Sequence, residues 1–137
     1  MEMNYVLKGK PLVLKSPRLS RWGHGTYDPL HNQKKLAQLE LLSQCPKILY
    51  TTQPLHVDIV FYMQRPKASK YKNLKWHTTR PDCDNMEKPL LDICKSIVFK
   101  DDSIVCSVSK KKVYSELPRT EFSFTILKDS NEKKEQP

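Results

Sequence analysis

The sequence contains little glycine and no long apolar run. Glycine occurs 3 times in 137 residues and proline 10 times, a composition that favours defined turns over a flexible linker. No apolar stretch approaches the ~20 residues that a membrane helix needs. The N-terminus shows no apolar segment followed by a cleavage site, so a signal peptide is not indicated. We therefore expect a cytoplasmic protein that does not enter the membrane.

Closely spaced cysteines are also absent. The cysteines stand at positions 45, 83, 94 and 106, and no pair has the two-residue spacing of a zinc knuckle or a redox motif. Because thiols stay reduced in the cytosol, we interpret all of them as free. A chain of this length buries roughly 68% of its unfolded surface, so it can fold as one domain without a crosslink.

Acidic residues are outnumbered by basic ones. This imbalance indicates which partners the protein binds and says nothing about its fold. Lys and Arg total 24 against 15 Asp and Glu, for a net charge of +9. Such a surplus favours a polyanionic partner, most often nucleic acid, while a merely soluble basic protein is the alternative.

The basic residues are densest in segment 64–80, which holds six Lys or Arg and no acid. Lysines neutralise phosphates and aromatic rings stack on unpaired bases, so we predict a DNA-contact surface here. The alternative is a solvated loop with Trp76 in the core. The candidate DNA contacts are Lys67, Lys70, Lys72, Lys75, Trp76 and Arg80, together with Arg18 and Arg21 in an early loop and Lys112 on a later strand. For the lysines at 110–112 the alternative is a charged, exposed sheet edge.

Hydrophobic periodicity predicts the order strand, helix, strand, helix, strand, strand. The expected strands cover 4–15, with an interruption at Gly9 and Pro11, and 54–63, 103–114 and 120–127. The expected helices cover 31–43 and 84–98, and a loop covers 16–30. Asp84 or Asn85 is predicted to cap the second helix, with Pro89 near the end of its first turn. These elements predict one α+β domain over residues 1–127, with a mixed sheet of about four strands and two main helices. The polar residues 128–137 are expected to form a disordered tail.

The acids are unevenly placed in this basic chain. Six lie between positions 82 and 102, namely Asp82, Asp84, Glu87, Asp92, Asp101 and Asp102. Clustered carboxylates repel one another unless a cation lies between them. Asp82 and Asp84 alternate in an extended segment, so both can face one ion, and Asp102 could return beside them. Hard oxygen ligands of this kind predict Mg²⁺, with Mn²⁺ as a possible substitute.

Lys88 adds a cation to the acidic cluster. It lies four residues after Asp84 and four before Asp92, which places the three on one side of a helix. An ammonium there can stabilise the negative charge that develops when a phosphodiester is cleaved. Each feature also has an ordinary explanation: Asp82 and Asp84 as helix caps, Lys88 and Asp92 as a surface ion pair, and Asp101-Asp102 as a turn.

The run Arg80-Pro81-Asp82-Cys83-Asp84-Asn85-Met86-Glu87-Lys88, followed by Asp92 and Asp101-Asp102, resembles the signature of the RusA family of Holliday junction resolvases. In that family a D-x-D-N-x-x-K segment precedes a further Asp and a D-D pair. Gly9-Lys10-Pro11, Pro17-Arg18, Tyr27-Asp28-Pro29 and Lys112-Val113-Tyr114 are similar to other family elements. The resemblance covers about residues 5–127.

This resemblance implies a homodimeric endonuclease that nicks two opposed strands of a four-way junction and requires Mg²⁺ or Mn²⁺. It implies that Asp82, Asp84 and Asp102 bind the metal and that Lys88 is catalytic. It further implies supporting roles for Asn85, Asp92 and Asp101. The sequence leaves two alternatives open: a nuclease for forks or flaps, and a DNA-junction-binding protein without catalysis.

Overall fold

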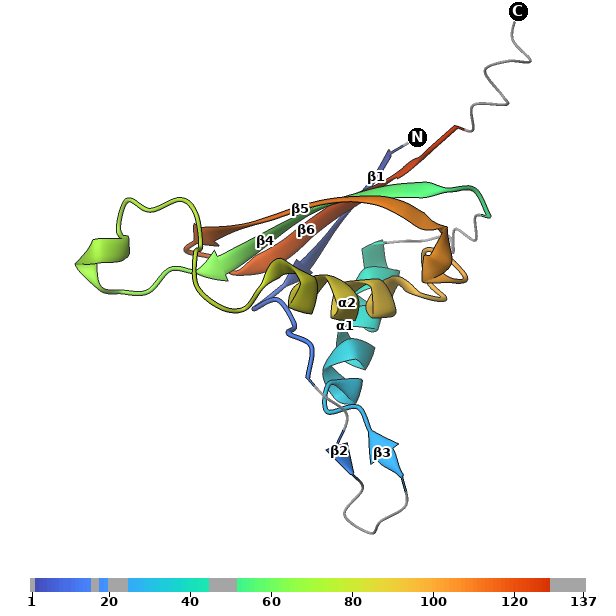
Figure 1. Ribbon diagram of the computed structural model, residues 1–137, viewed down its shortest axis with the longest axis horizontal. Helices are drawn as coiled ribbons and strands as arrows, with labels where there is room; N and C mark the ends of the chain where they lie inside the picture. The colour runs from blue at the N-terminus through green and yellow to red at the C-terminus, as the bar shows by residue number, and fades with distance from the viewer. Residues whose placement is uncertain (1, 16–17, 20–24, 45–51, 129–137) are drawn as a thin grey trace, which may run out of the picture.

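The computed structural model describes residues 2–15, 18–19, 25–44 and 52–128. Its centre is a four-stranded sheet in the order β1-β6-β4-β5 (Figure 1). The strands are β1 (Glu2–Lys8), β4 (Leu55–Gln64), β5 (Val105–Ser115) and β6 (Arg119–Ile126). Strand β6 is antiparallel to both of its neighbours, whereas β4 and β5 are parallel, so the sheet is mixed as predicted.

Two helices, α1 (His31–Gln44) and α2 (Cys83–Cys94), lie on one side of this sheet (Figure 1). Apolar side chains alternate with mostly polar ones along β4, which explains why helices cover only one side of the sheet. Val57, Ile59 and Phe61 are buried against the helices, while His56 and Asp58 face the other side and are partly or fully accessible. The predicted α+β architecture of one sheet and two main helices is confirmed.

Aromatic and aliphatic side chains fill the layer between sheet and helices. Phe99 and Phe124 are fully buried, and their rings meet edge to face at 5.8 Å between centroids. Met86, Leu90 and Ile93 close the core from α2. This packing fixes α2 against the sheet, which matters because α2 begins at the acidic segment.

The leucine repeat that predicted α1 is not its buried face. Leu41 is fully buried, but Leu36 and Leu39 are 68% and 65% exposed, and Leu42 is also exposed. The helix is instead held to β1 by polar contacts, among them a hydrogen bond of 2.9 Å from the Lys8 amide to Glu40. An apolar ridge of Leu36, Leu39 and Leu42 is therefore left on the surface.

The second helix begins within one residue of its predicted start, but its predicted cap and its predicted end were wrong. Asp82 is the N-cap residue, not Asp84 or Asn85, and the helix stops at Cys94 rather than at 98. The chain leaves the helix because Ser96 has a φ of 72°, in the left-handed region. Ile97 is still buried, so apolar spacing alone could not distinguish this turn from a continued helix.

Pro89 lies in the second turn of α2, not in its first as predicted. Proline has no N–H, so the carbonyl of Asn85, four residues earlier, receives no hydrogen bond from within the helix. The Leu14 amide donates to that carbonyl at 2.6 Å. The missing donor thus lets segment 11–15 bind the start of α2 through Leu14.

Part of the predicted loop 16–30 is a small hairpin of β2 (Arg18–Leu19) and β3 (Thr26–Tyr27). Two 3-10 helices, η1 (Ser69–Tyr71) and η2 (Asp102–Ile104), complete the elements. The predicted tail falls almost wholly outside the described residues. In the described part of the chain, no helix is both long and apolar enough to cross a bilayer.

Candidate active site

The acidic segment lies where α2 begins. Asp82 is the N-cap residue, yet its side chain makes no capping hydrogen bond. Its carboxylate is exposed and forms no hydrogen bond or ion pair with any described residue. Capping therefore does not account for Asp82, and both of its oxygens are available to another ligand.

Asp84, in the first turn of α2, is paired with a lysine from the sheet. The Lys110 ammonium, from β5, donates to Asp84 Oδ1 and also to Glu87 Oε1 at 2.6 Å. These hydrogen bonds, first that of Asp84, raise the pKa of Lys110. Glu87 thus binds a lysine of β5. Residue spacing did not reveal this contact between β5 and α2.

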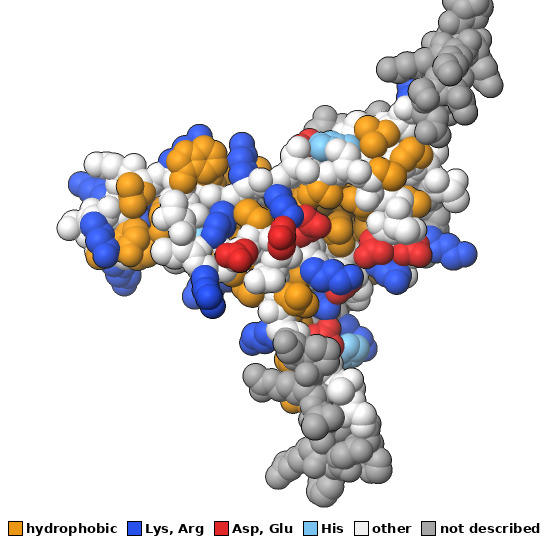
Figure 2. Space-filling view, in the orientation of Figure 1, with side chains coloured by type: hydrophobic (Ala, Val, Ile, Leu, Met, Phe, Trp, Pro, Cys, Tyr) orange, Lys and Arg blue, Asp and Glu red, His pale blue; other side chains and the backbone are white. Residues whose placement is uncertain are grey.

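Lys88 lies one turn after Asp84 and contacts two further carboxylates. Its Nζ atom is 3.5 Å from Asp92 Oδ1 and 3.7 Å from Asp102 Oδ2. The second contact joins α2 to η2, so the fold brings Asp102 beside Lys88. Figure 2 shows acidic side chains among Lys and Arg side chains on the face where α2 lies. The Lys88 side chain is 55% exposed, so its ammonium can reach a bound phosphate.

Asp92 connects Lys88 to a second lysine that sequence analysis missed. Lys34 of α1 lies 3.1 Å from Asp92 Oδ2 and 2.6 Å from Asp28 Oδ2. The Lys34 side chain is only 16% exposed, and its hydrogen bond lowers the pKa of Asp28. Asp92 is thus paired with a lysine on each side, and the supporting role predicted for it stays a prediction.

Asp101 and Asp102 have different surroundings. Asp101 is the N-cap residue of η2, and its carboxylate accepts a hydrogen bond from the Ser103 amide at 3.3 Å. This bond is the first cause of its lowered pKa. Asp101 therefore stabilises the start of η2, and Asp102 is the member of the pair that contacts Lys88. Asn85 is exposed in the first turn of α2, and its backbone N–H donates to the backbone carbonyl of Asp82.

These carboxylates suit a hard divalent cation in the kind of ligand they offer. Asp82 has no protein partner in the described chain, whereas lysine ammonium groups neutralise Asp84 and Asp102. Over residues 2–15, 18–19, 25–44 and 52–128, no three His, Cys, Asp or Glu side chains converge on one point. The donor chemistry fits, but a cation shared by the three predicted ligands requires their side chains to move.

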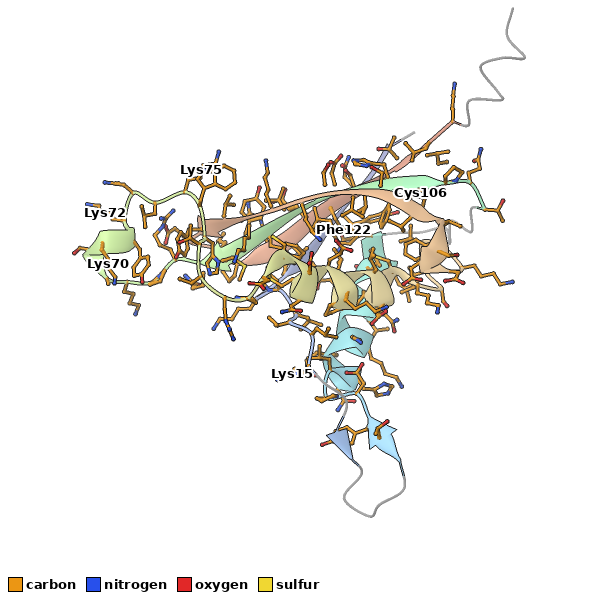
Figure 3. The ribbon with its side chains drawn as sticks, in the orientation of Figure 1. Lys15, Lys70, Lys72, Lys75, Cys106 and Phe122 are labelled. Carbon is orange, nitrogen blue, oxygen red and sulfur yellow. The ribbon has the colours of Figure 1, made fainter. Side chains whose placement is uncertain are left out.

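The basic segment 65–80 forms an arm that projects beyond the sheet (Figure 1). Arg65 organises it, donating through Nη1 to the carbonyls of Tyr71 and Leu74, each at 2.6 Å. Lys70, Lys72 and Lys75 lie on this arm, away from the helices (Figure 3). Trp76 is 53% exposed, so the alternative that places it in the core is wrong.

The other predicted DNA contacts differ in position. Lys67 and Arg80 are exposed, as a phosphate contact requires. The Lys112 ammonium instead donates to the backbone carbonyls of Thr79 and Pro81. Arg21 and the side chain of Arg18 lie outside the described part of the chain.

Comparison with known proteins identifies the family. A family model described as endodeoxyribonuclease RusA matches residues 8–124, a range that includes the arm and every acidic residue described above. The chain belongs to the RusA family. It is therefore an endonuclease in general character, and the resemblance seen in the D-x-D-N-x-x-K segment is confirmed.

Two relatives support this membership. The uncharacterized protein YqaN of Bacillus subtilis (strain 168) is 30% identical over 132 residues, covering 87% of this chain and 92% of its own. The crossover junction endodeoxyribonuclease rusA of Lactococcus phage r1t is 29% identical over 101 residues, covering 72% of this chain and 76% of its own.

Proposed function

We propose that this RusA-family endonuclease cleaves four-way DNA junctions by Mg²⁺-dependent phosphodiester hydrolysis, in DNA recombination and repair in the cytoplasm. The observation that carries the proposal is the placement of Asp82, Asp84, Lys88 and Asp102 around the first turns of α2. A similar rusA protein of a phage is named a crossover junction endodeoxyribonuclease, which supports a branched substrate. Cleavage of forks or flaps is the second candidate.

The residues divide the chemistry between them. When bound, Mg²⁺ would polarise the phosphate and lower the pKa of an attacking water. Asp82, Asp84 and Asp102 would hold the ion through carboxylate oxygens, with Mn²⁺ as a substitute. Lys88, fixed by Asp92, would stabilise the charge that develops on the phosphate oxygens. Asp92 keeps Lys88 in place because its other oxygen is bound by Lys34.

The direct test compares a labelled four-way junction, a replication fork and a linear duplex, each with and without Mg²⁺. Paired nicks in opposed arms of the junction, dependent on the metal, are expected. Cleavage of the fork in preference to the junction would move the function to the second candidate. Binding of the junction without cleavage under Mg²⁺ or Mn²⁺ would leave only a DNA-binding role.

We expect the basic arm to supply phosphate contacts. Each lysine that neutralises a phosphate adds about 0.9 to the slope of log K against log salt. Replacing Lys70 and Lys72 with Gln should therefore weaken junction binding and lower that slope by about 1.8. The matched control replaces Lys100 and Lys128, which are exposed but away from the arm. Equal slopes for the two double variants would remove the arm from the DNA interface.

We propose that the enzyme acts as a homodimer, because a two-fold substrate is matched by a two-fold protein. The apolar ridge of Leu36, Leu39 and Leu42 on α1 is the surface that we assign to this contact. Sedimentation should give twice the 16.1 kDa of the chain. Leu36→Gln with Leu39→Gln should give a monomer, whereas Leu117→Gln, at another exposed leucine, should not. A monomeric active protein would contradict the proposal.

A further inference from the structure

Strand β5 carries three consecutive lysines that face in two directions. Lys110 and Lys112 are paired in register with Ile59 and Phe61, which belong to the buried face of β4. Lys111 is paired with Val60 and belongs to the opposite face. Two of the three ammonium groups therefore lie on the side of the sheet that carries α2. The three lysines do not together form a charged, exposed sheet edge.

Lys112 binds the chain directly before the acidic segment. Its ammonium donates to the Thr79 carbonyl and, at 2.7 Å, to the Pro81 carbonyl. Pro81 is bonded to Asp82, so the second of these contacts lies one peptide from the N-cap residue. The Lys112 carbonyl also accepts a hydrogen bond from the His77 amide at 3.3 Å. Lys112 thus holds the end of the arm through its backbone and through its side chain.

No side-chain contact with a described residue fixes Asp82 itself. Its position follows from the backbone on either side of it. On the helix side the Asn85 amide donates to the Asp82 carbonyl at 3.1 Å. On the arm side the link is the Lys112 ammonium, and Lys112 is only partly exposed. Removing this donor would leave the part-buried Pro81 carbonyl without its partner, whereas water can replace the lysine at the exposed Thr79 carbonyl.

We propose that Lys112 is a positioning residue for the nuclease, which sets Asp82 by binding the Thr79 and Pro81 carbonyls and does not contact DNA phosphate. The inference rests on the proposed function, because it takes Asp82 as part of the active site. It replaces the expectation that Lys112 contributes to DNA binding. A misplaced catalytic group lowers the rate of the chemical step, whereas a lost phosphate contact weakens binding and its salt dependence.

The test compares Lys112→Met with Lys111→Met, the same change on the opposite face of the same strand. Single-turnover cleavage of a junction gives the rate of the bound complex. Junction affinity, measured over a range of salt without metal, gives the number of phosphate contacts. For Lys112→Met we expect a cleavage rate lower by about 10- to 100-fold, with affinity and salt slope as in the wild type. Lys111→Met should retain the wild-type cleavage rate.

The Lys112→Arg variant tests rescue. Its guanidinium can donate to both carbonyls, so it should recover part of the cleavage rate. It also gives a second variant if Lys112→Met does not fold, which a thermal melt would show. Loss of affinity with a salt slope lower by about 0.9 would overturn the proposal in favour of a phosphate contact. Wild-type cleavage by the Met variant, or an Arg variant that folds but is no faster than Met, would also overturn it. If the wild-type protein itself cuts no branched DNA, the proposed function fails instead.

Discussion

An Asp82→Asn variant is expected to bind branched DNA and leave it uncut. The Asp82 carboxylate has no partner among the described residues, so its replacement disturbs no internal contact. An amide oxygen is a weaker ligand for a divalent cation than a carboxylate. We expect the single-turnover rate to fall by about 10³-fold or more, equivalent to ~4 kcal/mol in the activation barrier. Junction affinity without metal should hold or increase, since one negative charge facing the phosphates is gone.

The matched control is Asp58→Asn. Asp58 is an exposed carboxylate on the opposite face of the sheet, and its contact is with His56. The Asp58→Asn variant should cleave at the wild-type rate, and both variants should have similar melting temperatures. An Asp82→Asn protein that cuts junctions at the wild-type rate would remove Asp82 from the site and leave the α2 start as an ordinary helix terminus.

A Lys88→Met variant is expected to lose cleavage by a different route. The change removes the ammonium that lies 3.7 Å from Asp102 and keeps the length of the side chain. Loss of one charge-stabilising donor typically lowers the chemical rate by about 10²- to 10³-fold. Affinity for Mn²⁺, measured by titration calorimetry, should not weaken, because Lys88 is not a ligand and its positive charge disfavours the ion.

Lys95→Met is the control for Lys88, since Lys95 is an exposed lysine at the other end of α2. Its cleavage rate should match the wild type. If Lys88→Met instead loses Mn²⁺ binding together with cleavage, the residue acts by holding Asp102 and Asp92 in place, and its assignment to the chemical step is wrong.

The spacing of residues was sufficient for some of this structure. Alternation in 54–63 predicted β4 and its buried face, because a strand places every second side chain on the same side. The helices were predicted because their apolar residues recur at helical spacing. The end of α2 was not, since Ile97 is buried in a turn after Ser96 adopts a positive φ. The N-cap residue was not singled out either, because Asp82, Asp84 and Asn85 could each begin the helix.

The sequence by itself determined the basic charge, the acidic segment, the order of the elements and the likeness to the RusA family, since all of these depend on residue identity and local spacing. Only the tertiary structure decided which lysine side chain pairs with each carboxylate. Lys34 and Lys110 reach the acids from α1 and β5, far away along the chain. Long-range pairing depends on how sheet and helices pack, and no local pattern records it. The same packing separates Lys112 from Lys111, which are adjacent in sequence but face opposite sides of a strand.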